Sequence, residues 1–177
     1  MSDFDPLRAI SGLLSTVKAT LVVAPDRFAP STIYDVNYRV AVIACAFEKH
    51  ARADVASGRR MQAARLKLYQ FVATRPWLLP VLSDWLESDQ DPQRSLLASQ
   101  RLRRGFLGDT MHDDVIGFLV ARRVLARLGK YVTPGTNFGW LSTLCNALRE
   151  AQLFVAERDV IDRVPDSKIT NNMLEGW

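Results

Sequence analysis

The sequence predicts a mainly α-helical protein with one small turn or hairpin in its C-terminal half. Three observations predict this class. Apolar residues recur at spacings of three and four along most of the 177-residue chain. Asp-Pro pairs, glycines and isolated prolines stand where helices would begin or end. The composition, 48% hydrophobic and 24% charged, is typical of a folded globular protein.

Two long helices are expected first. Asp5 and Pro6 form a cap and first-turn proline for a helix over 6–21, which a loop with two prolines then ends. A second helix is expected from Thr32 or Asp35 to about residue 53. Its alanines permit close approach of neighbouring elements, so we expect it to be central.

Glycine and proline divide the following stretch. Gly58 breaks the pattern, and Arg59 and Arg60 are expected to open a third helix that stops before Pro76. A short helix begins at Pro76 and is interrupted or restarted at Pro80.

The polar segment SDQDPQ is the expected boundary between two subdomains. The break falls near Asp89 and gives an N-terminal helical subdomain over 1–90 and a second over 91–177, together one cooperative unit. Asp91 and Pro92 then cap and start another helix, which runs to about residue 102.

The stretch 108–148 reads as helix, short extended turn, helix. Asp109 or Thr110 can cap the first helix, and Gly129 stops it. Residues 130–132 look extended, 133–135 form a tight turn, and Asn137 is placed to cap the second helix. This order resembles the end of a winged-helix domain. A last helix continues through residues 153–164 to Pro165.

Charge and cysteine usage set only broad limits. The 23 basic and 19 acidic residues give a net charge of +4, which permits contact with nucleic acid or an acidic partner without requiring it. Cys45 and Cys145 both lie on apolar sides of helical patterns, as expected for buried thiols in a reducing cytosol. The N-terminus lacks the cations of a secretory signal and no apolar run could span a membrane, so a cytoplasmic protein without membrane partners is expected.

Few patterns point to catalysis. There is no Walker loop, dinucleotide fingerprint, GxSxG elbow or paired-cysteine zinc spacing, and no cofactor is expected. The order of His50, the His112–Asp113 pair and a later acid, Asp159 or Asp162, resembles the metal ligands of HD-domain phosphohydrolases. In that family the metal activates water for attack on a phosphoester. A helix-capping region equally explains His112, and a protein that is not an enzyme is the preferred expectation.

Basic clusters are the expected contacts with DNA or an anionic partner. The helix from Asn137 is apolar and has no basic residue before Arg149, so it is expected to dock on protein and not to read DNA. Anionic contacts should instead come from the clusters that flank the preceding helix: Arg101, Arg103, Arg104, Arg122, Arg123, Arg127 and Lys130. Tryptophans serve either as packing anchors or as partner-docking residues: Trp77, Trp85, Trp140 and Trp177.

Three segments together carry a family resemblance. In chain order these segments are RRGFLGDTMHDDVIGFLVARRVLARLG, VTPGTNFGWL and FVAERDVIDRVPDSKIT. Their succession resembles the small middle component of bacterial ABC-three-component systems, including Lamassu-type defence loci. The turn here is TPG, where such a wing often has a longer hairpin. The resemblance implies a non-catalytic adaptor, winged-helix-like, that binds an ATPase related to structural-maintenance-of-chromosomes (SMC) and double-strand-break-repair proteins, together with a nuclease or other effector.

Three functions therefore remain open. The first is an adaptor subunit in anti-phage or anti-plasmid defence, with double-stranded DNA as a further contact. The second is a free-standing DNA-binding regulator, which would form a dimer and bind duplex in a salt-dependent way. The third is the metal-dependent phosphohydrolase.

Overall fold

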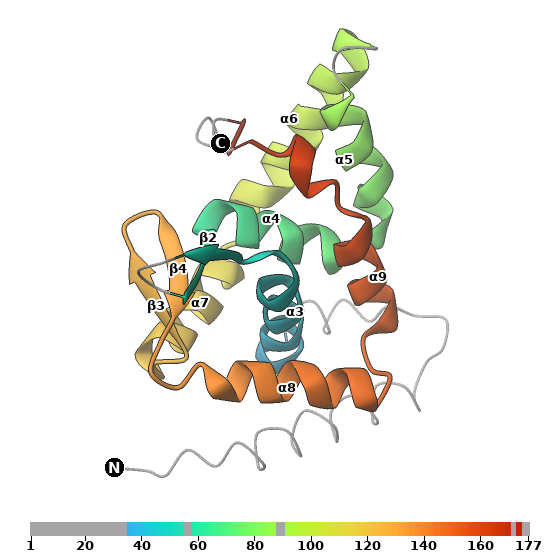
Figure 1. Cartoon of the computed structure of the whole chain (residues 1–177). Helices are drawn as coiled ribbons and strands as arrows, with labels where there is room; N and C mark the ends of the chain where they lie inside the picture. The colour runs from blue at the N-terminus through green and yellow to red at the C-terminus, as the bar shows by residue number, and fades with distance from the viewer. Residues whose placement is uncertain (1–34, 55–57, 88–90, 171–172, 175–177) are drawn as a thin grey trace.

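The computed structural model describes residues 35–54, 58–87, 91–170 and 173–174. The helix predicted over 6–21, the loop after it and Trp177 lie outside these residues. The described part is mainly helical and contains a four-stranded antiparallel sheet of order β1-β2-β4-β3 (Figure 1). The helical class predicted from the sequence is confirmed, and the sheet is larger than the single turn or hairpin that was expected.

Helix α3 (Val36–His50) is the central element, as predicted. The side chain of Asp35 caps it by accepting a hydrogen bond of 2.9 Å from the Tyr38 amide. Every residue over 38–47 is buried, because α4, α7, α8 and α9 all pack around this helix. The helix ends at His50, three residues before the predicted end, since the chain there enters a strand.

Strands β1 (Arg52–Asp54) and β2 (Gly58–Gln62) form an antiparallel hairpin. The expectation that Arg59 and Arg60 open a helix is therefore wrong. Both lie in β2, which continues the sheet by pairing with β4, and this partner is distant in the sequence. Pairing of that kind outweighs the local helical pattern.

Four helical segments follow: α4 (Ala63–Ala73), η1 (Pro76–Leu78), α5 (Leu79–Leu86) and α6 (Pro92–Gly108). The predicted start at Pro76 and restart near Pro80 are confirmed. Asp91 caps α6 by accepting a hydrogen bond of 3.0 Å from the Arg94 amide, as the Asp-Pro pair indicates. Helix α6 runs six residues past its predicted end and pairs with α5, and the two extend beyond the other helices (Figure 1).

The next helix, α7 (Met111–Ala121), is shorter than predicted. It has the expected acids in its first turn, but the chain leaves the helix after Ala121, and Arg123 takes a left-handed conformation with φ of 58°. Residues predicted as its last turns form strand β3 (Leu125–Leu128), paired with β4 (Tyr131–Pro134). Gly129, with φ of 57°, turns the hairpin and does not stop a helix.

Two predicted caps are wrong. Asp109 ends α6, and its carboxylate binds arginines; Thr110 precedes α7 without a capping side-chain bond. Helix α8 (Gly139–Glu150) starts after Phe138. The side-chain Nδ2 of Asn137 instead donates a 2.9 Å hydrogen bond to the Arg122 carbonyl, which ties the start of the hairpin to its end.

The last helix, α9 (Val155–Arg163), is separate from α8. The bend between them uses Gln152 and Phe154, both in the left-handed region. A turn, η2 (Asp166–Lys168), follows Pro165, which ends α9 as predicted.

One buried core joins residues from both sides of the predicted boundary at Asp89, and the boundary itself stays a prediction. Cys45 and Cys145 are buried in this core, as expected. Among the described residues, no helix is long and apolar enough to cross a bilayer.

Candidate partner-binding surface

Helix α6 buries only a narrow stripe. The buried residues Ser95, Ala98, Leu102 and Phe106 recur every three or four positions and face the rest of the molecule. The hydroxyl of Ser95 donates to the Trp85 carbonyl at 2.9 Å, which fixes α6 against α5. All other positions of the helix are at least partly exposed.

The outward side of α6 combines leucine and arginine. Leu96, Leu97 and Leu107 are 58%, 67% and 52% exposed. Arg101, Arg103 and Arg104 are exposed on the same helix, which contains no acidic residue over 92–108. Within the part of the chain that the structure describes, none of these three arginines makes an ion pair. The surface is therefore both apolar and basic.

Helical spacing sorts these side chains into lines. Leu97, Arg101 and Arg104 are separated by four and three residues, so they lie on one side of the helix. With Gln100 and Gly105 they line a shallow hollow. Arg94 lies outside this group because it pairs with Asp84 of α5 at 2.7 Å. The name α6 surface is used below for Leu96, Leu97, Leu107 and the three arginines.

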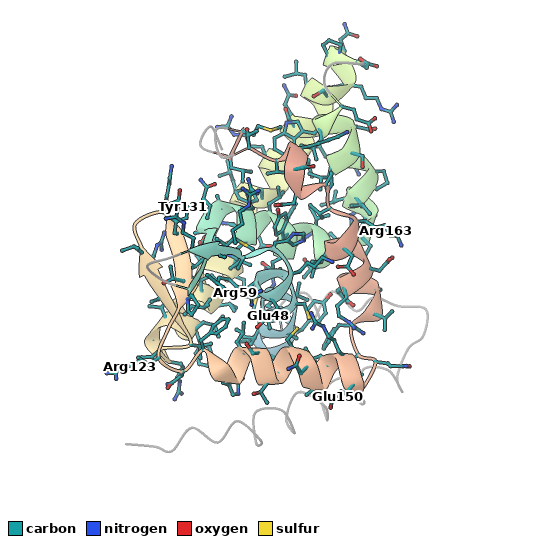
Figure 2. The ribbon with its side chains drawn as sticks, in the orientation of Figure 1. Glu48, Arg59, Arg123, Tyr131, Glu150 and Arg163 are labelled. Atoms are coloured by element: carbon teal, nitrogen blue, oxygen red, sulfur yellow. The ribbon has the colours of Figure 1, made fainter. Side chains whose placement is uncertain are left out.

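The second predicted basic cluster is spread out. Arg122, Arg123, Arg127 and Lys130 are all exposed but occupy the two ends and one strand of the β3–β4 hairpin. Arg123 points outward at one end, and Tyr131, the neighbour of Lys130, lies at the other (Figure 2). The guanidinium of Arg122 lies over the Phe118 ring, 5.5 Å from its centroid. These four residues do not form one anion-binding patch.

The tryptophans divide between core and surface. Trp77 is 53% exposed at the start of η1, whereas Trp85 is buried beneath α6. Trp140 is half-buried against the core. Of the two roles that the sequence leaves open, the burial of Trp85 favours a packing anchor. Among the described tryptophans, Trp77 has the exposure that suits a partner contact.

The residues of the metal-dependent alternative are engaged separately. His112 is buried against Gln70, and the Nε2 of His50 lies 3.0 Å from the Ile161 carbonyl oxygen. Asp113 pairs with Lys67, and Asp159 pairs with Arg163. Over the described ranges, no three His, Cys, Asp or Glu side chains are grouped to hold a metal ion.

The sequence did not predict a buried polar network behind α6. The Nη1 of Arg39 donates to both carboxylate oxygens of Asp109, and Arg75 reaches the same carboxylate at 3.2 Å. The Oε1 of Gln70 lies 3.3 Å from Arg39 Nη1 and 2.9 Å from His112 Nδ1. Because Arg39 only donates, this oxygen is the acceptor for both, and His112 carries its proton on Nδ1.

Burial lowers the pKa of His112 from 6.5 to about 4, so its ring is neutral at neutral pH. The network joins α3, α4 and the α6–α7 junction and holds the base of α6 in place. Its one signal in the sequence is Arg39, a single charge inside an apolar run.

Comparisons with protein-family models, curated proteins and solved structures found no match. The function is therefore inferred from the surface chemistry of the described residues.

Proposed function

We propose that this chain is a non-catalytic adaptor subunit that uses the α6 surface to bind a larger protein. The observation that carries the proposal is the exposure of three leucines beside three arginines on one acid-free helix. Burying a leucine side chain contributes roughly 1.5–3 kcal/mol, so leaving three in water is costly unless a partner covers them.

The expected partner surface is an apolar groove with acidic edges. The leucines would enter the groove, and Arg101, Arg103 and Arg104 would pair with the edge carboxylates. Such pairs add specificity and speed association more than they add affinity. The absence of acids from α6 suits this arrangement, because the helix itself supplies no carboxylate that would compete for the arginines.

The resemblance to the middle component of ABC-three-component systems gives the partner its expected identity. In this proposal the chain acts in the bacterial cytoplasm with an SMC-type ATPase and an effector such as a nuclease, in anti-phage or anti-plasmid defence. The order helix α7, hairpin β3–β4, helix α8 supports a winged-helix-like unit. The apolar side of α8, with Leu141, Leu144 and Leu148, packs into the core, so DNA reading by that side is not part of the proposal.

Co-purification from native cells tests the proposal. The tagged full-length chain should capture a coiled-coil ATPase, and Leu97→Asp should abolish the capture. Leu128→Asp is the matched control, because Leu128 is 60% exposed on β3, away from α6, and its substitution should leave capture unchanged. Circular dichroism should show the same helix content for both variants.

The DNA-binding alternative gives a different result in the same material. A lone homodimer that captures no ATPase and binds duplex DNA with a steep salt dependence would overturn the adaptor proposal. Equal loss of capture in both leucine variants would also overturn the assignment to α6.

A further inference from the structure

The two cysteines of the chain meet between helices α3 and α8. Cys45 and Cys145 are the only cysteines in the sequence, and both are buried, with exposed fractions of 5% and 1%. A hydrogen bond joins their side chains, and both are free thiols. We propose that this pair is a reversible redox site, at which hydrogen peroxide converts the two thiols into an intramolecular disulfide.

The packing of α8 against α3 holds the cysteines face to face. Glu48 lies one turn after Cys45 on α3, and Ser142 lies one turn before Cys145 on α8. The hydroxyl of Ser142 donates a hydrogen bond to Oε1 of Glu48. Residues three apart lie on the same side of a helix, so this contact and the contact between the thiols are neighbours across one interface. The fold therefore places the two sulfur atoms within reach of each other before any oxidation.

Positive charge lies close to the thiol pair. Arg149 follows Cys145 by one turn of α8, and Arg158 comes from α9, which packs against α3. The Nε of Arg158 is buried without a hydrogen-bond partner, and over the described ranges Arg158 makes no ion pair. A buried donor that is left unpaired destabilises the fold. A thiolate in the pair would supply the negative charge that Arg158 lacks.

The hydrogen bond between the cysteines gives each a different role. This bond lowers the pKa of the Cys145 thiol, and the charges of Arg149 and Arg158 lower it further. Burial and the charge of Glu48 oppose the effect without reversing it. The same bond, together with burial, raises the pKa of the Cys45 thiol. Cys145 therefore ionises first and accepts the hydrogen bond that Cys45 donates. Because the thiolate is the nucleophilic form of cysteine, Cys145 is the residue that attacks the oxidant.

The disulfide forms in two steps. The Cys145 thiolate attacks one oxygen of hydrogen peroxide, so that an S–O bond forms and the O–O bond breaks. The hydroxide that leaves takes up the proton that Cys145 released and becomes water. Cys45 then attacks the sulfur of the resulting sulfenic acid, the S–S bond forms, the S–O bond breaks, and the Cys45 proton leaves with the hydroxide as a second water. The two sulfurs together lose two electrons, which reduce the peroxide.

Burial selects the class of oxidant. Hydrogen peroxide is little larger than water, and local opening of packed helices is sufficient to admit it. A disulfide such as oxidised glutathione would have to bring a bulky sulfur into line with Cys145, whose residue is 1% exposed. The site should therefore react with peroxide in preference to disulfides. This reaction is separate from partner binding at the α6 surface, and the proposal does not depend on the adaptor function.

Thiol counting on the full-length protein tests the proposal. After treatment with hydrogen peroxide, the unfolded protein should have no free thiols and should still run as a monomer on a non-reducing gel. Peptide mapping should find Cys45 cross-linked to Cys145, and dithiothreitol should restore both thiols. Two free thiols after millimolar peroxide, irreversible oxidation of both cysteines, or a disulfide between two copies would overturn the proposal. An equal rate with oxidised glutathione would overturn the assignment to peroxide.

Single cysteine variants separate the two roles. In Cys45→Ser the reaction should stop at the sulfenic acid of Cys145, which dimedone traps. In Cys145→Ser the remaining thiol of Cys45 should stay free under the same treatment. Equal reaction of the remaining cysteine in both variants would overturn the assignment of Cys145 as the nucleophile.

Arginine variants test the positioning role of Arg158. Arg158→Met should slow disulfide formation several-fold, because the thiolate loses a nearby positive charge, and Arg158→Lys should restore most of the rate. Arg163→Met is the matched control, since Arg163 is exposed on the same helix and pairs with Asp159. Equal slowing by Arg158→Met and Arg163→Met, or no rescue by Arg158→Lys, would overturn the role of the Arg158 charge.

Discussion

Arg39 and Asp109 form a buried ion pair that connects the middle of α3 to the end of α6. The Nη1 of Arg39 lies 2.7 Å from one carboxylate oxygen of Asp109 and 2.8 Å from the other. Neither side chain is more than 3% exposed. A buried charge is tolerated only when it is paired and hydrogen-bonded, so each residue of the pair requires the other.

Removing either residue of this ion pair should lower the free energy of unfolding, and the loss should differ between the two variants. Asp109→Leu leaves the Arg39 charge buried without its carboxylate and should lower the free energy of unfolding by about 3–5 kcal/mol. Arg39→Met should cost less, because Asp109 keeps Arg75 at 3.2 Å. Urea denaturation of both variants measures the difference. The double variant should lose less than the sum of the two, and simple additivity would contradict the pairing.

His112 should make the protein sensitive to mild acid. The folded pKa of about 4 lies below the ordinary 6.5, mainly through burial, so between these values the unfolded chain binds a proton that the folded chain does not. The free energy of unfolding should therefore be level above pH 6.5 and fall as the pH drops toward 4, by a total on the order of 3 kcal/mol.

Urea denaturation between about pH 7 and pH 5 measures this slope, above the range in which Glu48 and Asp166, whose pKa values are lowered, contribute. His112→Asn places an amide where Nδ1 donates to Gln70 and removes the titration, so its profile should be flat. The same slope in that variant would assign the acid sensitivity to another group.

Local signals in the sequence were sufficient for much of the helical framework. The Asp35 cap, the Asp91–Pro92 start and the start at Pro76 were all predicted, because each depends on residues adjacent in the chain. Strands β1, β2 and β3 were missed. They are three to five residues long, and β2 is held by pairing Met61 with Val132, which no local pattern indicates.

The functional surfaces were predictable to different degrees. The exposure of Arg101, Arg103 and Arg104 followed from their charge, but apolar Leu97 gave no reason to expect solvent contact. The contact of Cys45 with Cys145 depends on how α8 packs against α3, which no local pattern indicates.

Gly135 should not tolerate even a methyl group. A Cβ at this position would lie 2.2 Å from the Arg123 carbonyl oxygen and 2.7 Å from its carbon, and backbone atoms cannot rotate away. The close approach is needed because the Gly135 amide donates to the Val124 carbonyl at 3.0 Å, joining the end of β4 to the residue that precedes β3. Gly135→Ala should therefore lower the free energy of unfolding by about 1–3 kcal/mol, as overpacking does.

Gly117→Ala is the matched control, since Gly117 lies in α7 with no atom within 4 Å of the added Cβ, and the change should raise stability by about 0.5–1 kcal/mol. Thermal and urea denaturation of the two variants should thus shift in opposite directions, and a gain in both would contradict the contact between β4 and the α7–β3 turn.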